Sequence, residues 1–276
     1  MPADRLLIFG GSGFVGRHLA ASAVDAGWEV HATHWTAPAP RAAHTWRGDI
    51  TDPAWIASTI GQVEPSHIVN AAYIQDGPIV HEVCAAAPAT MALHAQRAGS
   101  RFIHISTDLV FDGSLGRPYR EDDPTSPLTE YGRAKVDAEQ RILDIDPGAV
   151  VARTSLIYGA PDAPQESLVR RAHDDGDIQF FTDEFRTAVH VVDLAGALLR
   201  VATADHAGLL HLAGRERLNR LEFARALAGP LGLDPARLTG RTQDPTLGPR
   251  SADVSLDTTR ARGLGLELPG PIERSA

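Results

Sequence analysis

The sequence of 276 residues has little cysteine, no long hydrophobic run and no excess of positive charge. Its single cysteine, Cys84, cannot form an internal disulfide, and in an alanine-rich segment we expect a buried filler rather than a reactive thiol. No apolar run approaches the ~18 residues that a membrane span requires. The apolar N-terminal segment is interrupted by glycines and lacks a strongly basic flank, unlike a secretion signal. These absences predict a cytoplasmic protein without a membrane partner.

The charge balance narrows the classes of ligand. A formal net charge of -9 argues against sequence-independent nucleic-acid binding, which requires clustered cations. An anionic ligand must therefore be held by a few placed arginines. The twelve histidines form neither an H-E-x-x-H motif nor a C-x-x-C partner set, so no metal site is expected.

Short apolar runs alternate with helical patterns through the first two thirds of the chain, which predicts an α/β protein with a doubly wound parallel sheet of the Rossmann type. We expect strands at 5–10, 29–34, 45–49, 66–72, 101–106 and 148–154, and helices at 16–27, 53–63 and 130–145. Residues 1–153 would form a dinucleotide-binding domain. Residues 154–276 would form mainly a smaller substrate-binding lobe, with possible chain crossovers between the two.

The pattern of apolar residues in the C-terminal lobe is less regular than in the first two thirds of the chain. We expect helices at 167–175, 191–202 and 220–232, strands at 178–181 and 208–214, and a loosely ordered tail from residue 264.

A glycine-rich turn joins the first expected strand to the first helix. Gly10, Gly13 and Gly16 have G-x-x-G-x-x-G spacing, which suits a tight turn, close approach of the backbone to a diphosphate, and packing of the helix on the strand. The N–H groups at the helix start would face the phosphates. The residues expected to contact a dinucleotide here are Gly10, Ser12, Gly13, Phe14, Val15 and Gly16.

The second strand indicates which dinucleotide is bound. An acid at its end would read the ribose 2′-hydroxyl of NAD, but Thr33, His34 and Trp35 stand there. NADP is therefore favoured over NAD, with His34 as a candidate for the 2′-phosphate beside Arg17 and Arg41. At the end of the third strand Asp49 and Ile50 would adjoin the adenine, although Asp49 also suits a helix N-terminus.

A hydroxyl, a phenol and an ammonium are expected to meet at the sheet edge. Tyr131 and Lys135 lie four residues apart on one helix face. An ammonium near a phenol stabilises the phenolate, which prepares Tyr131 for proton exchange with a substrate oxygen. Thr107 ends a central strand, where ligands of doubly wound sheets bind. Tyr131 and Lys135 would also contact the cofactor.

Several segments carry a resemblance over nearly the whole chain: "GGSGFVG", "GDITD", "NAA", "ISTDLVFDG", "EDDPTSPLTEYGRAK", "RTSLIYG" and "DEFRTAVHVVDLA". The sequence resembles the extended short-chain dehydrogenases/reductases, and within them the family of dTDP-4-dehydrorhamnose reductase and its sugar-nucleotide-binding relatives. The resemblance implies catalytic roles for Thr107, Tyr131 and Lys135, and a cofactor floor at Asn70 to Ala72, with Ala71 and Ala72 in contact with the cofactor. It also implies hydride delivery to a sugar C4 ketone, and homodimers are common among the relatives.

The departures from this family lie on the substrate side. An aromatic residue is usual where this chain has Leu156, and prolines are usual where it has Ala188 and Ser251. They put the identity of the sugar in doubt rather than the redox chemistry.

The residues expected to bind substrate are Thr107, Asp108, Tyr131, Arg186 and Arg250. Arg186 is the first choice to hold a nucleotide diphosphate because a planar guanidinium suits phosphate. The alternative is a salt bridge to Asp183 or Glu184. Asp108 also suits a turn.

The sequence therefore predicts an NAD(P)-dependent reductase of the 4-keto group of a nucleotide-activated deoxysugar. The resemblance also implies that a 4,6-dehydratase would carry an aspartate–glutamate pair directly after the threonine; here Leu109 follows Asp108, so this activity is disfavoured. Two alternatives stay open: an epimerase, which uses the same three residues, and a non-catalytic cofactor-bound regulatory subunit like methionine adenosyltransferase β.

Overall fold

The computed structural model describes residues 4–39, 41–42, 44–161, 163–244, 246 and 250–275. The chain divides into two compact units. The first unit comprises Met1–Ser106, Thr129–Ala152 and Ala195–Leu210, and the second comprises Thr107–Leu128, Arg153–Leu194 and His211–Ala276. The chain thus passes repeatedly from one unit to the other.

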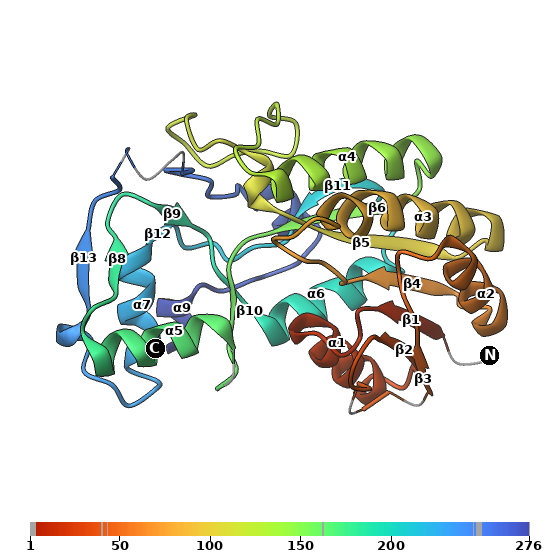
Figure 1. Ribbon diagram of the computed structural model, residues 1–276, viewed down its shortest axis with the longest axis horizontal. Coiled ribbons are helices and arrows are strands. Elements are labelled where there is room, and N and C mark those ends of the chain that lie inside the picture. Colours follow the sequence, from red (N-terminus) through yellow and green to blue (C-terminus); the bar gives the residue numbers. More distant parts are fainter. Residues whose placement is uncertain are drawn as a thin grey trace. The chain divides into compact units, whose positions relative to one another are not determined.

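A seven-stranded sheet forms the framework of the first unit, with strand order β11-β6-β5-β4-β1-β2-β3 (Figure 1). The pairs β3–β2, β2–β1, β1–β4 and β4–β5 are parallel. The predicted doubly wound α/β fold is confirmed. The strands are β1 (Arg5–Phe9), β2 (Glu29–His34), β3 (His44–Arg47), β4 (His67–Asn70), β5 (Arg101–Thr107), β6 (Val150–Thr154) and β11 (Gly208–His211).

Helices cover both faces of this sheet. On one face α3 packs between α2 and α4, and α1 and α6 lie on the other (Figure 1). The helices are α1 (Phe14–Asp25), α2 (Pro53–Val63), α3 (Ala87–Ala98), α4 (Glu130–Ile145) and α6 (Val191–Thr203). Among the described residues, no helix combines the length and apolar character needed to cross a membrane.

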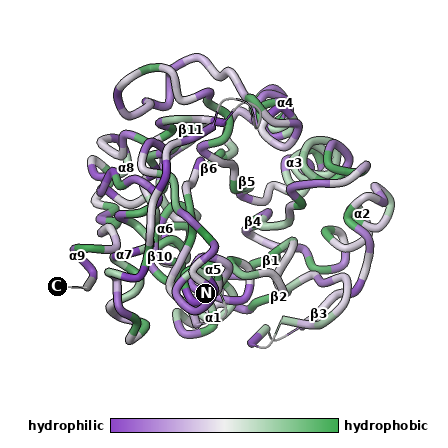
Figure 2. The backbone as a smooth tube through the Cα atoms, turned by 60° about the vertical axis from the view of Figure 1, so that its left-hand side comes forward, coloured by the Kyte–Doolittle hydropathy of each residue, from purple (hydrophilic) through white to green (hydrophobic). Residues whose placement is uncertain are grey.

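Local sequence explains where these helices begin and which face they bury. Asp52 caps α2 by accepting the Ala54 N–H, and Thr129 caps α4 by accepting the Gly132 N–H. In Figure 2 α4 alternates between hydrophilic and hydrophobic residues along the chain. The buried residues of α4 recur every three or four positions and so form one face of the helix, which includes both Tyr131 and Lys135.

Two features of the first unit differ from the prediction. Helix α3 and the π-helical turn η1 (Glu82–Ala86) that precedes it were not predicted, because an alanine-rich segment interrupted by Pro88 lacks a clear periodic pattern. Strand β11 was assigned to the C-terminal lobe but pairs with β6 in the main sheet. The position of β11 in the main sheet is explained by the burial of Leu210 and by the apolar helix α6 that precedes the strand.

The second unit has short elements around its own core. They are η2 (Asp108–Val110), β7 (Ile157–Tyr158), α5 (Pro164–Asp175), β8 (Gln179–Phe181), β9 (Phe185–Arg186), β10 (Val189–His190), β12 (Leu218–Asn219), α7 (Arg220–Ala228), η3 (Pro235–Arg237), β13 (Thr239–Arg241), α8 (Thr259–Gly263) and α9 (Pro271–Ser275). Tyr158, Phe180 and Phe223 are among the core residues. The prediction of a loosely ordered tail is wrong up to residue 275, since Leu266 and Leu268 are buried; residue 276 lies outside the described residues.

Two helical glycines provide a matched test of the packing of α1. A Cβ on Gly16 would lie 2.2 Å from the Gly10 carbonyl oxygen, whereas a Cβ on Gly61 in α2 would meet nothing within 4 Å. Gly16→Ala should therefore lower the free energy of unfolding by about 1–3 kcal/mol through overpacking. Gly61→Ala should raise it by up to about 1 kcal/mol through helix propensity. Urea unfolding followed by circular dichroism measures both, and equal effects would refute the packing argument.

Candidate active site

The glycine-rich turn between β1 and α1 is shaped by backbone contacts. Gly10 has φ +79°, and a Cβ there would lie 2.7 Å from the Ala72 nitrogen. The backbone around Ala71 and Ala72 thus lies directly against this turn. Gly13 caps α1, donates its N–H to the Gly10 oxygen at 3.1 Å and supplies no side-chain cap. The first N–H groups of α1 therefore remain suited to an anion.

One further glycine in the turn was not singled out from the sequence. A Cβ on Gly11 would lie 2.5 Å from the Ala32 Cβ, so this glycine lets the turn pack on β2. The Gly10 N–H donates to Thr33 Oγ1 at 3.1 Å, and the Gly11 N–H donates to the Thr33 oxygen at 2.9 Å. These contacts fit a cradle for the diphosphate of a dinucleotide.

The residues expected to contact the adenosine end of the dinucleotide have different surroundings in the structure. His34 ends β2, and its Nδ1 is buried without a hydrogen-bond partner among the described residues. Arg41 instead pairs with Asp25 at 2.6 Å. Asp49 is exposed and accepts hydrogen bonds from both the N–H and the hydroxyl of Thr51 at 2.8 Å. Asp49 is not the N-cap of α2, a role that Asp52 takes.

Lys135 is held inside the first unit by β5. Its side chain is 2% exposed, and Nζ donates to the Ile105 carbonyl oxygen at 2.9 Å. Nζ also lies 5.8 Å from the centre of the buried Tyr131 ring. Burial lowers the pKa of Lys135 from 10.5 to about 8, against the opposing charges of Cys84 and Glu139.

The two neighbouring hydroxyls at the end of β5 have different tasks. Ser106 Oγ donates to Glu139 Oε1 at 2.5 Å and so binds β5 to α4. Thr107 Oγ1 accepts the Leu109 N–H at 3.2 Å and donates to Asp108 Oδ1 at 3.3 Å. Thr107 is the last residue of β5 and lies two residues beyond Ile105, whose carbonyl oxygen accepts from Lys135.

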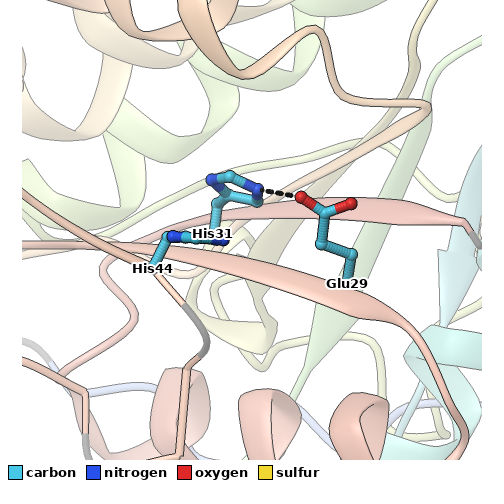
Figure 3. A group of neighbouring side chains, drawn as sticks. All are labelled: Glu29, His31 and His44. Carbon is cyan, nitrogen blue, oxygen red and sulfur yellow. Dashed lines mark hydrogen bonds and ion pairs between the residues drawn. The ribbon is translucent and has the colours of Figure 1, made fainter.

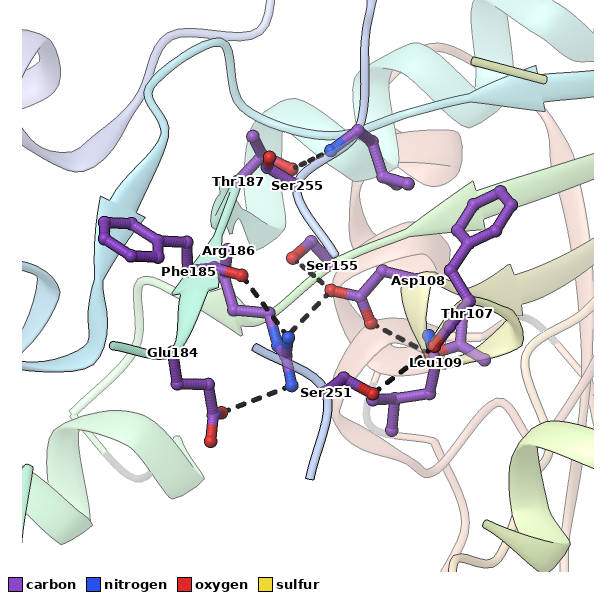
Figure 4. Close-up of polar contacts among 12 residues, drawn as sticks. Thr107, Asp108, Leu109, Ser155, Glu184, Phe185, Arg186, Thr187, Ser251 and Ser255 are labelled. Atoms are coloured by element: carbon purple, nitrogen blue, oxygen red, sulfur yellow. Dashed lines mark hydrogen bonds and ion pairs between the residues drawn. The ribbon is translucent and has the colours of Figure 1, made fainter. Parts of the chain in front are cut away.

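Asp108 is the centre of a buried polar cluster in the second unit (Figure 4). It accepts a hydrogen bond from Ser155 Oγ at 2.6 Å, and its Oδ2 lies 3.6 Å from Arg186 Nε. Burial raises the pKa of Asp108, while Arg186 and the two hydroxyls act in the opposite direction. Asp108 is thus more than a turn residue, because it joins Thr107 to Arg186.

Arg186 is tied to a second carboxylate. Its NH2 group lies 3.2 Å from Glu184 Oε1, and its side chain is only 9% exposed. This is the salt bridge that the sequence left as an alternative, formed with Glu184, while Asp183 accepts the Gln243 N–H. Glu184 also pairs with Arg250 at 2.9 Å, and the Arg250 side chain is 47% exposed.

A second polar group, formed by Glu29, His31 and His44, has ligand atoms close enough for a metal ion (Figure 3). The Trp46 indole N–H donates to His31 Nδ1 at 3.1 Å, which leaves the proton of the neutral ring on Nε2. Nε2 then donates to Glu29 Oε1 at 2.9 Å. This pattern satisfies His31 without a metal, and a cation at Nε2 would have to displace that proton.

Comparisons with known proteins agree with this architecture. Residues 4–270 match the family model described as RmlD substrate binding domain. A dTDP-4-dehydrorhamnose reductase of Mycobacterium tuberculosis is 34% identical, covering 96% of this chain and 88% of the relative. Methionine adenosyltransferase 2 subunit beta of Rattus norvegicus is 27% identical, covering 98% and 85%. The fold matches a Bacillus anthracis dTDP-4-dehydrorhamnose reductase in complex with NADP, with a TM-score of 0.83, 19% identity and coverage of 98% and 96%.

Arg186 and Arg250, two of the three arginines that contact Glu184, should differ in their effect on stability. Arg186→Met would leave the buried Asp108 without its cation and would remove one of the cations beside Glu184, and we expect a loss of about 3–5 kcal/mol in the free energy of unfolding. Arg250→Met removes a half-exposed pair and should cost at most about 1 kcal/mol. Denaturant titrations of both variants test this. Similar losses would show that Arg186 is not a structural cation.

Proposed function

Because the chain belongs to the RmlD substrate binding domain family, we propose that it is an NADPH-dependent reductase of the 4-keto group of a nucleotide-activated deoxysugar. The observation that carries this proposal is the buried Lys135, held by β5 beside Tyr131. Such an ammonium is positioned to stabilise a phenolate, which suits proton transfer to the oxygen of a ketone.

The cofactor would be held mainly by backbone. The Gly10–Gly16 turn and the N–H groups of α1 suit its diphosphate, with Ser12, Phe14 and Val15 beside them, and Ala71 and Ala72 suit its floor. Asp49 and Ile50 would adjoin the adenine. When bound, the reduced nicotinamide would supply the hydride that the reaction needs. The absence of an acid at the end of β2 favours a 2′-phosphate there.

The protein's own groups would act on the substrate oxygen. Tyr131 would donate a proton to it as the hydride arrives, and Lys135 would stabilise the phenolate left behind. Thr107 would hold the same oxygen by a hydrogen bond. In the structure the Thr107 hydroxyl donates a hydrogen bond to Asp108 Oδ1 at 3.3 Å, so it would have to turn from this carboxylate to donate to the substrate oxygen.

The diphosphate of the substrate would be attracted by the second unit. Glu184 and Asp108 are surrounded by Arg186, Arg220 and Arg250, so the cluster has one positive charge in excess. Arg250 is the most exposed of the three and would contact the phosphate. Arg186 is buried between the two carboxylates. It would therefore act on the phosphate indirectly, by holding Asp108 and Glu184 in place.

An epimerase and a regulatory subunit are the competing functions. An epimerase would use the same residues without net consumption of reduced cofactor. The likeness to methionine adenosyltransferase 2 subunit beta over 98% of this chain favours the second alternative. A pull-down that recovers a stoichiometric enzyme partner, together with no turnover on any keto sugar, would select the regulatory role.

Removing the phenol hydroxyl tests the reductase directly. Purified protein is incubated with a panel of nucleotide 4-keto sugars and NADPH or NADH, and absorbance of the reduced nicotinamide is followed. Tyr131→Phe should lower kcat by about 10²–10⁴-fold, the usual contribution of a positioned acid. Its affinity for NADPH, measured by fluorescence titration, should stay within about threefold. Retained turnover in this variant would contradict the assignment.

The end of β2 offers a test of cofactor preference. His34→Asp places a carboxylate where it would accept the ribose hydroxyls and repel a 2′-phosphate. We expect the Kd for NADPH to rise about tenfold or more and that for NADH to fall. His34→Asn, which adds no charge, is the matched control. If both cofactors respond alike to the carboxylate, His34 does not face the adenosine ribose.

A further inference from the structure

We infer that His104 is a positioning residue for Lys135: it presents a fixed imidazole N–H to the lysine amine and thereby sets where Nζ lies and which protonation state it favours. His104 lies on β5 and is fully buried. Its effect on the reaction rests on the proposed function, whereas its effect on Lys135 itself does not.

A backbone N–H, which can only donate, fixes the orientation of the side chains around His104. The Ala72 N–H donates to Asn70 Oδ1 at 3.0 Å, which fixes the orientation of the Asn70 amide. Asn70 Nδ2 then donates to His104 Nδ1 at 3.0 Å. Nδ1 of His104 is therefore an acceptor and carries no proton.

His104 is fully buried, and burial together with Lys135 places its pKa well below the ordinary value. The ring is therefore neutral, and its single proton is on Nε2. Nε2 lies 3.5 Å from Lys135 Nζ. The ring thus directs an N–H group at the lysine nitrogen.

An N–H directed at Nζ distinguishes the amine from the ammonium. A neutral amine has a lone pair that can accept from His104, while an ammonium has only donors. The positive end of the N–H dipole also repels the ammonium. Nζ keeps its bond to the Ile105 oxygen in either state. His104 thus acts in the same direction as burial and favours proton release from Lys135.

The other titratable groups around Lys135 come from two helices. Cys84 lies on η1, and Tyr131 and Glu139 lie on α4. Negative charge on Cys84 or Glu139 would stabilise the ammonium, and Glu139 is already bonded to Ser106. His104 is thus the neighbour on β5 that opposes those charges.

The amino-acid composition makes this inference testable. Lys135 is the only lysine in the sequence, and the other 25 cationic side chains are arginines. An arginine could not accept the His104 N–H, because a guanidinium has no acceptor and does not titrate. Protein labelled with ¹³C at lysine Cε gives one side-chain resonance, whose pH titration reports Lys135 alone.

Two substitutions at His104 separate the two ring nitrogens. In His104→Asn the amide oxygen replaces Nδ1 and accepts from Asn70, but nothing donates to Nζ. In His104→Gln the amide nitrogen takes the place of Nε2 and still donates to it. We expect the titration midpoint of Lys135, about 8 in the unaltered protein, to rise by about one unit or more in His104→Asn and to change much less in His104→Gln. Equal midpoints in the unaltered protein and His104→Asn would overturn the inference, as would equal rises in both variants.

A substitution outside the histidine gives an independent measurement if a His104 variant fails to fold. Asn70→Asp offers only acceptors, so His104 Nδ1 must carry the proton and Nε2 would then accept from the lysine. The Lys135 midpoint should rise by about one unit or more. An unchanged or lowered midpoint in this variant would contradict the proton count. Circular dichroism checks that each variant is folded.

Activity provides the readout that links His104 to the reaction. If Lys135 must be charged, the alkaline limb of kcat/KM for keto-sugar reduction should move upward in His104→Asn together with the resonance, while His104→Gln keeps the limb near its original pH. A shifted resonance in a protein that reduces no keto sugar would sink the proposed function and leave the positioning role intact. An unshifted resonance in an active reductase would overturn the positioning role of His104 and leave the proposed function intact.

Discussion

The contact between the Lys135 ammonium and the Ile105 carbonyl organises the candidate active site. An ammonium with 2% exposure is costly, and the pKa of about 8 measures how much burial disfavours the charge. Because the folded-state pKa lies below the ordinary 10.5, the unfolded chain binds more protons between these two values. Stability therefore increases as pH rises through that window, and below about pH 8 the folded protein bears the full cost of the charge. A group so unfavourable for stability is best explained by its chemistry.

The first unit holds this ammonium by two links between β5 and α4. Lys135 reaches the Ile105 oxygen, and Ser106 reaches Glu139 one turn further along the helix. Because consecutive residues of β5 supply both partners, the helix cannot slide along the strand without losing both contacts. The position of Tyr131 follows, since it lies one helical turn from Lys135. The geometry of the phenol and the ammonium is thus set by secondary structure rather than by loops.

Sequence patterns predicted the parts of the molecule that depend on local rules. The Gly10 turn needs a left-handed residue in close approach to Ala72, and that requirement appears directly as glycine spacing. The tyrosine–lysine spacing likewise follows helix periodicity. Contacts between residues distant in sequence left no such signal. His104 looks like any strand residue until Asn70 and Lys135 are seen on either side of it, and nothing in the sequence near Arg186 indicates that it also contacts Asp108.

The burial of Arg186 also bears on how Thr107 is positioned. Here Asp108 joins the Thr107 hydroxyl to Arg186, and Ser155 completes its hydrogen bonding. These contacts hold the strand-end hydroxyl in one orientation, at the cost of removing two charges from water. Because the single Thr107 proton points to Asp108 in this arrangement, the same contacts set the position of the hydroxyl but would have to be partly given up when it donates to a substrate oxygen.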